Sequence, residues 1–291
     1  MSEIRKVGIL GAGLMGSGIA EVCARAGFTV VVREPTEELL AKGRMRVTNS
    51  LSKAKQRGKL NDAEEIAIAS RLTFSSSLEE LSSSDLIVEA IVENLDVKRE
   101  VYQALDALCG PETIFCSNTS SLTITEMAAA TKRPDRFAGL HFFNPVPVMK
   151  LAEVVRGLAT SDATVAAVTA FARALGKEPV ACRDNSGFIV NRLLVPFLLD
   201  AIRAHEQGVG SIEDIDTGMK LGCAHPMGPF ELLDYVGLET VYAIAEIMFA
   251  EYRETRFAPP ALLKRLVLAG RFGRKTGRGF FEYDEKGNRK G

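Results

Sequence analysis

The sequence predicts an α/β fold, a doubly wound parallel sheet followed by an all-helical C-terminal domain. In the first 184 residues, short apolar segments that indicate buried strands alternate with segments of helical apolar spacing. Such alternation is typical of a parallel sheet covered by helices. From residue 185 onward, the apolar residues recur only at helical spacing. We therefore expect two domains, 1–184 and 185–291, with the boundary in Asp184–Gly187.

The composition argues against several classes of function. The chain has 291 residues, 46% of them hydrophobic, and a formal net charge of −1. This charge balance disfavours nucleic acid or an anionic membrane as partner. No signal peptide and no apolar run of membrane-spanning length is apparent. The five dispersed cysteines contain no CxxC pair. We expect a cytoplasmic protein with buried free thiols, without disulfides and without a metal site.

The first strand, Lys6–Leu10, leads into a glycine-rich turn and an apolar helix. Gly11 can take the tight turn, and Gly13 has no Cβ, so that a pyrophosphate can approach the backbone. Gly16 lets the helix pack closely on the strand, and the free amides of the first helical turn face the phosphate charge. The pattern predicts a Rossmann-type dinucleotide site that also includes Leu14 and Met15. The alternative is an ordinary strand-to-helix turn.

The second strand, 28–33, ends at Glu34. An acidic residue at this position binds the ribose hydroxyls of the adenosine and repels a 2′-phosphate, which favours NAD over NADP. Two alternatives remain: Arg33 can tolerate that phosphate, and Glu34 can simply lead into the helix that follows Pro35.

A cationic helical excursion follows, with helices expected over 36–57 and 62–71. No acidic residue occurs between Leu39 and Asn61, whereas seven basic residues do: Lys42, Arg44, Arg46, Lys53, Lys55, Arg57 and Lys59. A solvated helix face explains such a run equally well as a clamp for a polyanion such as a nucleotide phosphate.

The alternation of strands and helices then resumes. The further strands are expected at 72–74, 85–90, 113–118, 136–141, 151–157 and 178–183, with helices at 95–108 and 162–175. In a parallel sheet the ligand lies at the carboxyl ends of the strands, where segments 90–94 and 117–121 both fall. In the second domain, helices are expected at 188–207, 212–221, 237–253 and 261–269, before a glycine-rich basic tail.

One of the three histidines lies beside this predicted crevice. His141 ends a strand and is soon followed by a rigid Asn-Pro. Imidazole titrates near working pH, so we expect a general base here, although a lone histidine is more often structural. Glu153 interrupts an apolar strand, and burial of a carboxylate without a partner is unfavourable. We expect Glu153 to orient His141 and fix its tautomer; the alternative is a glutamate that faces water.

Several motifs together carry a resemblance to a known family. They are GAGLMGSGIA at 11–20, VEAIVEN at 88–94, SNTSSL at 117–122, HFFNP at 141–145, NRLL at 191–194 and KTGRGFF at 275–281. In this order they resemble the L-3-hydroxyacyl-CoA dehydrogenase family, and most of all its short bacterial 3-hydroxybutyryl-CoA dehydrogenases. The resemblance covers nearly the whole chain.

The resemblance implies hydride transfer between NAD and C3 of a short-chain (S)-3-hydroxyacyl-CoA, in either direction, in fatty-acid metabolism. His141 matches the family's base and Glu153 its orienting residue. Ser120 and Asn191 match residues that position the substrate oxygen. The cofactor contacts match Glu93, Lys98, Ser120 and Asn144. The excursion at 36–71 matches the arm that holds coenzyme A, with Ser50 and Arg57 nearest to its CoA contacts.

Two residues depart from the family pattern, in which aspartate usually stands at position 34 and lysine at position 57. Because of the first departure, the NAD preference stays open. Two other functions also stay open: a dehydrogenase of a free hydroxy acid or sugar acid, and a non-catalytic NAD-binding protein. The second domain is expected to form a homodimer through the outer faces of its apolar helices. Chain length, acyl tail, direction and pathway do not follow from the sequence.

Overall fold

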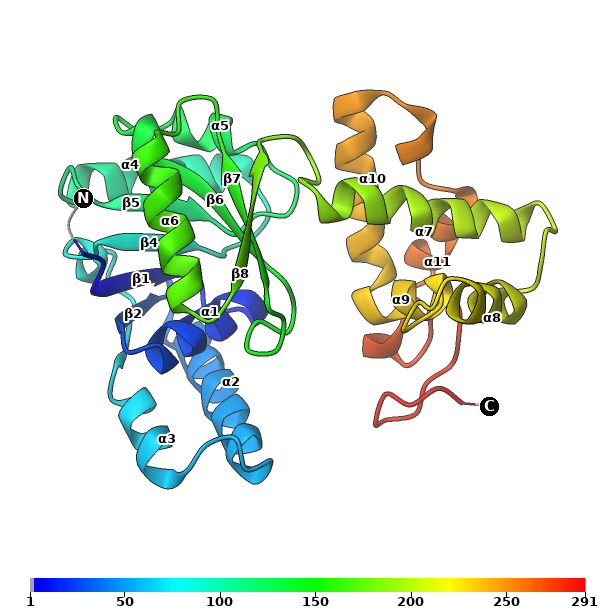
Figure 1. Cartoon of the computed structure of the whole chain (residues 1–291), viewed down its shortest axis with the longest axis horizontal. Helices are drawn as coiled ribbons and strands as arrows, with labels where there is room; N and C mark the ends of the chain where they lie inside the picture. The colour runs from blue at the N-terminus through cyan, green and yellow to red at the C-terminus, as the bar shows by residue number, and fades with distance from the viewer. Residues whose placement is uncertain (1–2, 291) are drawn as a thin grey trace. The chain divides into compact units, whose positions relative to one another are not determined.

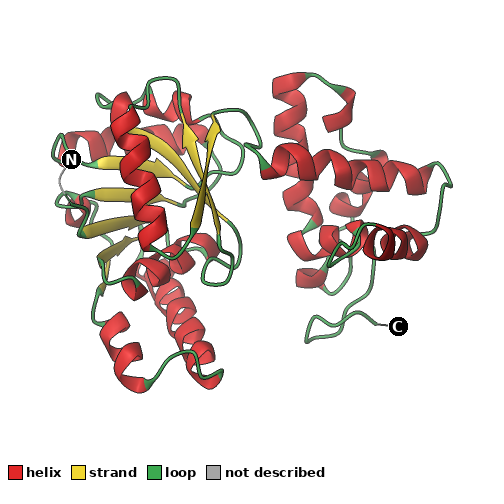
Figure 2. Cartoon of the chain, in the orientation of Figure 1, coloured by secondary structure: helices red, strands yellow, loops and turns green. Residues whose placement is uncertain are grey.

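The computed structural model describes residues 3–290 and divides the chain into two compact units, up to residue 185 and from residue 186 onward. Figure 1 shows the chain path, and Figure 2 shows that the sheet belongs to the first unit. The second unit is built from helices and connecting loops. The predicted combination of an α/β sheet with an all-helical C-terminal part is confirmed.

The first unit contains one eight-stranded sheet in the order β3-β2-β1-β4-β5-β6-β7-β8. The strands are β1 (Lys6–Leu10), β2 (Thr29–Arg33), β3 (Leu72–Ser75), β4 (Leu86–Glu89), β5 (Ile114–Ser117), β6 (Phe137–Phe142), β7 (Leu151–Arg156) and β8 (Glu178–Arg183). The strand order reverses direction between β1 and β4, so the topological switch point lies directly after the glycine-rich turn.

One pair of strands departs from the predicted parallel sheet. Strands β6 and β7 run antiparallel, with His141 opposite Glu153, whereas all other neighbouring strands are parallel. The linker 143–150 is too short for the crossover that a parallel pair needs. The reversal matters for the site because it sets these two residues side by side.

Helices cover both faces of the sheet. They are α1 (Leu14–Arg25), α2 (Glu37–Gln56), α3 (Asp62–Ala69), α4 (Leu95–Leu108), α5 (Ile124–Ala128) and α6 (Asp162–Ala174). The two arm helices begin as expected, because Thr36 caps α2 and Asn61 forms a capping box with Glu64 at α3. Helix α5 has only five residues, too few for the sequence to show an apolar period.

The core of the first unit lies between the sheet and these helices. Strands β1 and β4 are almost entirely buried, and so are the three central residues of β2, as expected for central parallel strands. Gly43 of α2 packs directly on the Cβ of Ala12, so α2 lies close against the glycine-rich turn. The arm is therefore packed beside the dinucleotide site.

The second unit consists of α7 (Val190–Glu206), α8 (Ile212–Gly222), α9 (Pro229–Val236), α10 (Leu238–Tyr252) and α11 (Ala261–Leu268). Helix α9 was not predicted; it begins at a proline, and Asp216 accepts hydrogen bonds from its first amides at Phe230 and Glu231. The basic tail folds back onto Asp234, which accepts hydrogen bonds from the amides of Phe280 and Phe281.

The prediction of buried thiols needs two corrections. All five thiols are free, and Cys23, Cys109 and Cys116 are buried. Cys182 is only half-buried, and Cys223 is exposed because it lies at the end of α8. Burial raises the pKa of the Cys23 and Cys116 thiols, which makes them unreactive. Within residues 3–290, no helix is both long and apolar enough to cross a membrane, and no acidic, cysteine or histidine side chains cluster as metal ligands do.

Candidate active site

A histidine–glutamate pair lies at the junction of β6 and β7. His141 Nδ1 is 2.7 Å from Glu153 Oε2, and Glu153 is completely buried. The antiparallel register places the two residues directly opposite each other, so both side chains leave the same face of the sheet. This contact assigns the proton on the neutral ring to Nδ1, so the lone pair of Nε2 can accept a proton.

The other ring nitrogen faces Ser120. Its Oγ lies 3.1 Å from His141 Nε2, and it comes from the loop that follows β5. The neighbouring Asn118 accepts a hydrogen bond of 2.8 Å from the Phe142 amide, which joins this loop to the end of β6. A hydroxyl and an imidazole nitrogen therefore converge on one point at the carboxyl ends of two adjacent strands. Such a pair can hold the oxygen of an alcohol or a ketone.

A buried ionic network supports the Ser120 loop. Lys98 Nζ on α4 is 2.6 Å from Glu89 Oε1 and 3.1 Å from Glu93 Oε2. Glu93 in turn accepts hydrogen bonds from the Thr119 hydroxyl and, at 3.2 Å, from the Ser120 amide. Burial alone would raise the pKa of Glu93, but the Lys98 ammonium and these hydrogen bonds together lower it.

Sequence reasoning missed the contribution of Glu89, which is the last residue of β4 and completely buried. The signal was present, because a carboxylate that closes an apolar strand needs a partner, as for Glu153. The partner lies nine positions further along the chain, on a helix.

The glycine-rich turn has the geometry that a dinucleotide needs. Gly11 has a φ of +100°, and a Cβ at Gly16 would collide with the Gly11 carbonyl oxygen. A Cβ at Gly13, in contrast, would point into open space, and no side chain caps the first turn of α1. The amides at the start of α1, beside the exposed Leu14 and the half-buried Met15, are therefore open to a phosphate.

The residues at the end of β2 lie beside this turn. Glu34 accepts a hydrogen bond from the Ala12 amide, so its carboxylate is held against the predicted dinucleotide site. Arg33 donates a hydrogen bond of 3.3 Å to the Ser76 carbonyl. In this conformation the carboxylate, rather than the guanidinium, is held at the glycine-rich turn, which favours NAD.

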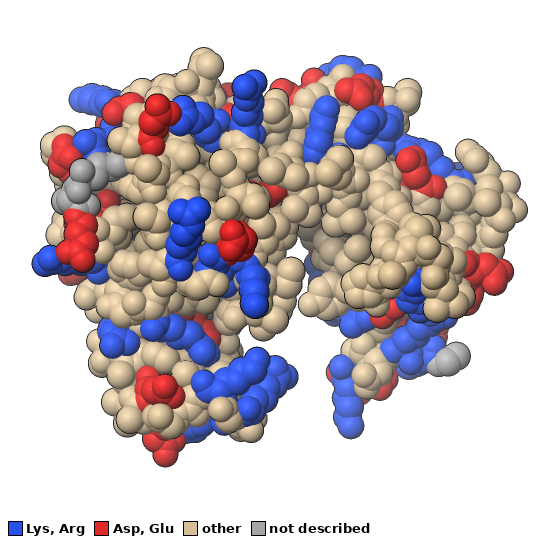
Figure 3. Space-filling model, viewed as in Figure 1, with Lys and Arg blue, Asp and Glu red and all other residues tan. Residues whose placement is uncertain are grey.

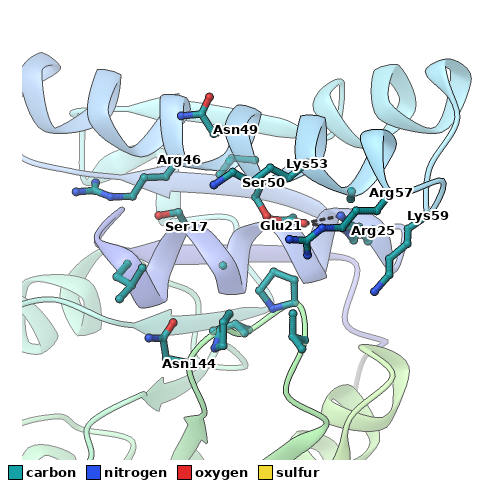
Figure 4. Close-up of a pocket in the computed structure, with 18 residues that line it drawn as sticks. Ser17, Glu21, Arg25, Arg46, Asn49, Ser50, Lys53, Arg57, Lys59 and Asn144 are labelled. Carbon is teal, nitrogen blue, oxygen red and sulfur yellow. Dashed lines mark hydrogen bonds and ion pairs between the residues drawn. The ribbon is translucent and has the colours of Figure 1, made fainter. Parts of the chain in front are cut away.

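A cavity of about 510 Å³ lies between α1, α2 and the loop at 144–148. Figure 4 shows the predicted CoA contacts Ser50 and Arg57 on the α2 side of this cavity, with Asn144 on the opposite side. Four further basic side chains also line it: Arg25, Arg46, Lys53 and Lys59. Ten polar or charged residues thus line one cavity, and five of them are cations.

The structure divides the cationic run between the two interpretations. Lys55 forms ion pairs with Asp62 and Glu65 of α3, and Arg44 stacks on the Phe74 ring. Lys42 pairs with Glu38 on the surface of α2. Figure 3 shows Lys and Arg gathered over the α2–α3 arm. Part of the run is therefore a solvated or structural face, and the remainder lines a cavity.

Lys177, which sequence reasoning did not single out, lies behind the cavity wall. Its buried ammonium donates hydrogen bonds to the carbonyls of Val146 and, at 2.8 Å, Met149. Burial lowers the pKa of Lys177. These bonds fix the loop that carries Asn144 and closes one side of the cavity.

Asn191 lies in the first turn of α7 in the second unit, and its role stays a prediction.

Comparison with known proteins identifies the family. Residues 6–185 match the NAD-binding domain of 3-hydroxyacyl-CoA dehydrogenase, and residues 187–283 match the C-terminal domain of the same enzyme family. The chain belongs to the 3-hydroxyacyl-CoA dehydrogenase family. The predicted family, oxidoreductase class and NAD cofactor are thereby confirmed.

Individual members of the 3-hydroxyacyl-CoA dehydrogenase family are similar along their whole length. The 3-hydroxybutyryl-CoA dehydrogenase of Mycobacterium tuberculosis is 50% identical over 282 residues, which cover 96% of this chain and 99% of the relative. The human mitochondrial hydroxyacyl-coenzyme A dehydrogenase is 50% identical over 287 residues, covering 96% of this chain and 91% of the relative.

A solved member of the family has the same fold. The crystal structure of (S)-3-hydroxybutyryl-CoA dehydrogenase from Ralstonia eutropha superposes with a TM-score of 0.93 at 44% identity and covers 97% of this chain and all of the solved one. These similarities favour a 3-hydroxyacyl-CoA dehydrogenase over the free hydroxy acid dehydrogenase and the non-catalytic protein. The roles of the individual site residues stay predictions.

Proposed function

We propose that this enzyme interconverts short-chain (S)-3-hydroxyacyl-CoA, such as (S)-3-hydroxybutanoyl-CoA, and 3-oxoacyl-CoA with NAD. The observation that carries the proposal is the His141–Glu153 pair with Ser120 at Nε2 of the ring. A non-catalytic dinucleotide-binding protein has no need of this set. The names of the similar proteins support the acyl-CoA substrate and the short chain.

The protein residues move and hold one proton. The bound NAD supplies the hydride acceptor when the alcohol is oxidised. His141 Nε2 accepts the proton of the 3-hydroxyl group, and Glu153 stabilises the imidazolium that forms. Ser120 orients the substrate oxygen at the same nitrogen, and Asn191 is proposed to hold this oxygen as well. In the reverse direction, the imidazolium returns its proton to the ketone oxygen.

The cationic cavity is proposed to bind the CoA part of the substrate. Five basic side chains lie around it, whereas Glu21 is its one carboxylate and forms an ion pair with Arg25. CoA carries phosphate groups that a free hydroxy acid lacks, so a cationic wall favours the thioester. Ser50 and Arg57, which line this cavity, are proposed as direct contacts.

We also propose a homodimer in the cytoplasm, formed through the second unit. Its helices carry exposed apolar side chains, among them Leu193 at 66% and Leu221 at 83% exposure. Burying such side chains against a second copy would be favourable. Sedimentation equilibrium at micromolar concentration is expected to give a dimer; a stable monomer contradicts this part of the proposal.

The direct test measures NADH consumption with acetoacetyl-CoA and, separately, with free acetoacetate. We expect turnover with the thioester and little with the free acid. Equal activity on both would contradict the role of the cationic cavity. With NADPH in place of NADH, slower turnover is expected because of Glu34, and a clear preference for NADPH would refute that assignment.

A histidine variant tests the base. His141→Ala is expected to lower kcat by roughly 10²- to 10⁴-fold, with little change in NADH affinity, because it removes the proton acceptor. The matched control is His205→Gln in the second unit, where the imidazole contacts the Gly210 carbonyl. Wild-type turnover by His141→Ala would show that another group is the base.

A further inference from the structure

Three charges form a compact cluster at the end of β4, and we call Glu89, Lys98 and Glu93 the acidic triad. Glu89 and Lys98 are almost fully inaccessible, with side-chain exposures of 0% and 1%, while Glu93 is 37% exposed. Glu89 is fully hydrogen-bonded, since it also accepts bonds from the Ile91 amide at 2.8 Å and the Ser117 hydroxyl at 2.6 Å.

The triad carries an excess negative charge. Its two carboxylates share one ammonium, so the formal sum is one negative charge. Arg99, the next basic residue on α4, forms ion pairs with Glu126 and Asp96. Within the described chain, no other lysine or arginine forms an ion pair with Glu89 or Glu93.

Such an arrangement is expected to contribute little to the stability of the fold. Removing charges from water is unfavourable, and well-packed apolar residues often stabilise a core as well as a buried ion pair does. A pair would cancel its own charge, whereas this cluster keeps one net negative charge, which hydrogen bonds and solvent at Glu93 stabilise without a second cation. A cationic ligand group nearby gives the arrangement a physical reason.

The triad lies next to the point where chemistry occurs. Glu93 Oε1 is 3.2 Å from the Ser120 amide nitrogen, and Ser120 Oγ is 3.1 Å from His141 Nε2. The loop that carries Glu93 begins at Ala90, whose carbonyl lies against Gly11 of the glycine-rich turn. Hydride transfer requires the nicotinamide ring beside the substrate carbon, and thus in this region. The ring is cationic in NAD⁺ and neutral in NADH.

We propose that the negative charge of Glu89 gives the acidic triad its net charge and thereby strengthens the binding of NAD⁺ more than the binding of NADH. The comparison is with the same site without this charge. Glu89 is too deeply buried to touch the cofactor, so it acts through Lys98 and Glu93 as a positioning residue. The inference rests on the proposed function only in placing the nicotinamide ring near His141.

The test compares the dissociation constants of the two cofactor forms in Glu89→Gln. Glutamine keeps the shape: its oxygen can accept from Ile91 and Lys98, and its amide can donate to the Ser117 hydroxyl. The loss of one negative charge is expected to raise the Kd of NAD⁺ roughly fivefold to tenfold, since a cation and an anion attract each other appreciably in a partly buried site. The Kd of NADH is expected to change less than twofold.

NADH binding is measured by its fluorescence and NAD⁺ binding by calorimetry, both without acyl-CoA. Asp106→Asn is the matched control, because Asp106 is a nearly buried acid paired with Arg133 at the other end of the same helix. We expect it to leave the ratio of the two Kd values unchanged.

A purely structural role for Glu89 would weaken both cofactor forms by the same factor, and an unchanged ratio overturns the proposal. If Glu89→Gln does not fold, Glu93→Gln removes the same charge at the more exposed end of the triad and must raise the ratio in the same direction. If the wild-type enzyme does not turn over acetoacetyl-CoA, the proposed function is contradicted. The ratio of the two Kd values can still be measured, because cofactor binding is determined without acyl-CoA.

Discussion

The contact between Glu153 and His141 makes the sharpest prediction about catalysis. Glu153→Gln keeps the size of the side chain, and its amide oxygen can still accept a hydrogen bond from His141 Nδ1. It therefore preserves the tautomer and removes only the charge. Because Glu153 is completely buried and lies 2.7 Å from the ring, the imidazolium formed during catalysis loses the counter-charge that this contact supplies.

The magnitude follows from the type of contact. A hydrogen bond to a charged group contributes about 1.5–3 kcal/mol, and water does not replace the missing charge in a fully buried site. A loss of about 2–3 kcal/mol in the transition state corresponds to a fall in kcat of roughly 30- to 150-fold. The reaction equilibrium is unchanged, so kcat/KM must fall by the same factor in both directions at a given pH.

The assay measures kcat and KM for acetoacetyl-CoA reduction and 3-hydroxybutanoyl-CoA oxidation. The KM of the cofactor is expected to stay near that of the wild type, since Glu153 is inaccessible. The control is Glu178→Gln, an exposed residue at the start of β8. If Glu153→Gln retains kcat within a factor of two, the counter-charge does not stabilise the reacting imidazole and the reasoning is refuted.

Two further predictions concern substrate binding and stability. Arg57→Ala is expected to raise the KM for acetoacetyl-CoA about fivefold with little change in kcat, and the increase should be smaller at high salt. Lys42→Ala, which lies outside the cavity, should leave this KM unchanged. Equal effects of the two substitutions would contradict the cavity assignment. Asp234→Asn should lower the free energy of unfolding by about 1–3 kcal/mol in urea titrations, because an amide NH₂ would face the donors at Phe280, Phe281 or Tyr283. Burial, opposed by these bonds, raises the pKa of Asp234 above 3.8, so the folded state holds this proton more tightly than the unfolded state. The stabilising contribution of this proton is therefore complete below about pH 4 and is lost as pH rises through the raised pKa. The stability advantage of the wild type over Asp234→Asn should shrink over that pH window, and an advantage that grows would contradict this.

Much of the candidate site followed from local sequence signals. His141 was proposed from its place at a strand end, and Glu153 from a carboxylate inside an apolar strand. The same signal at Glu89 passed unnoticed, because its partner Lys98 lies on a helix. For the arm, the sequence showed a run of cations but not which of them face inward; Lys55 turned out to pair with α3.

The sequence by itself determined the alternation of strands and helices, the glycine-rich turn and the helical character of the second half. These features depend on apolar spacing and backbone freedom within a few residues, so short stretches of the sequence are enough to predict them. Only the tertiary structure decided that β7 reverses, which cations line the cavity and which charges share the acidic triad. Each of these depends on contacts between residues far apart in the chain, because packing of the whole sheet and its helices determines which side chains meet.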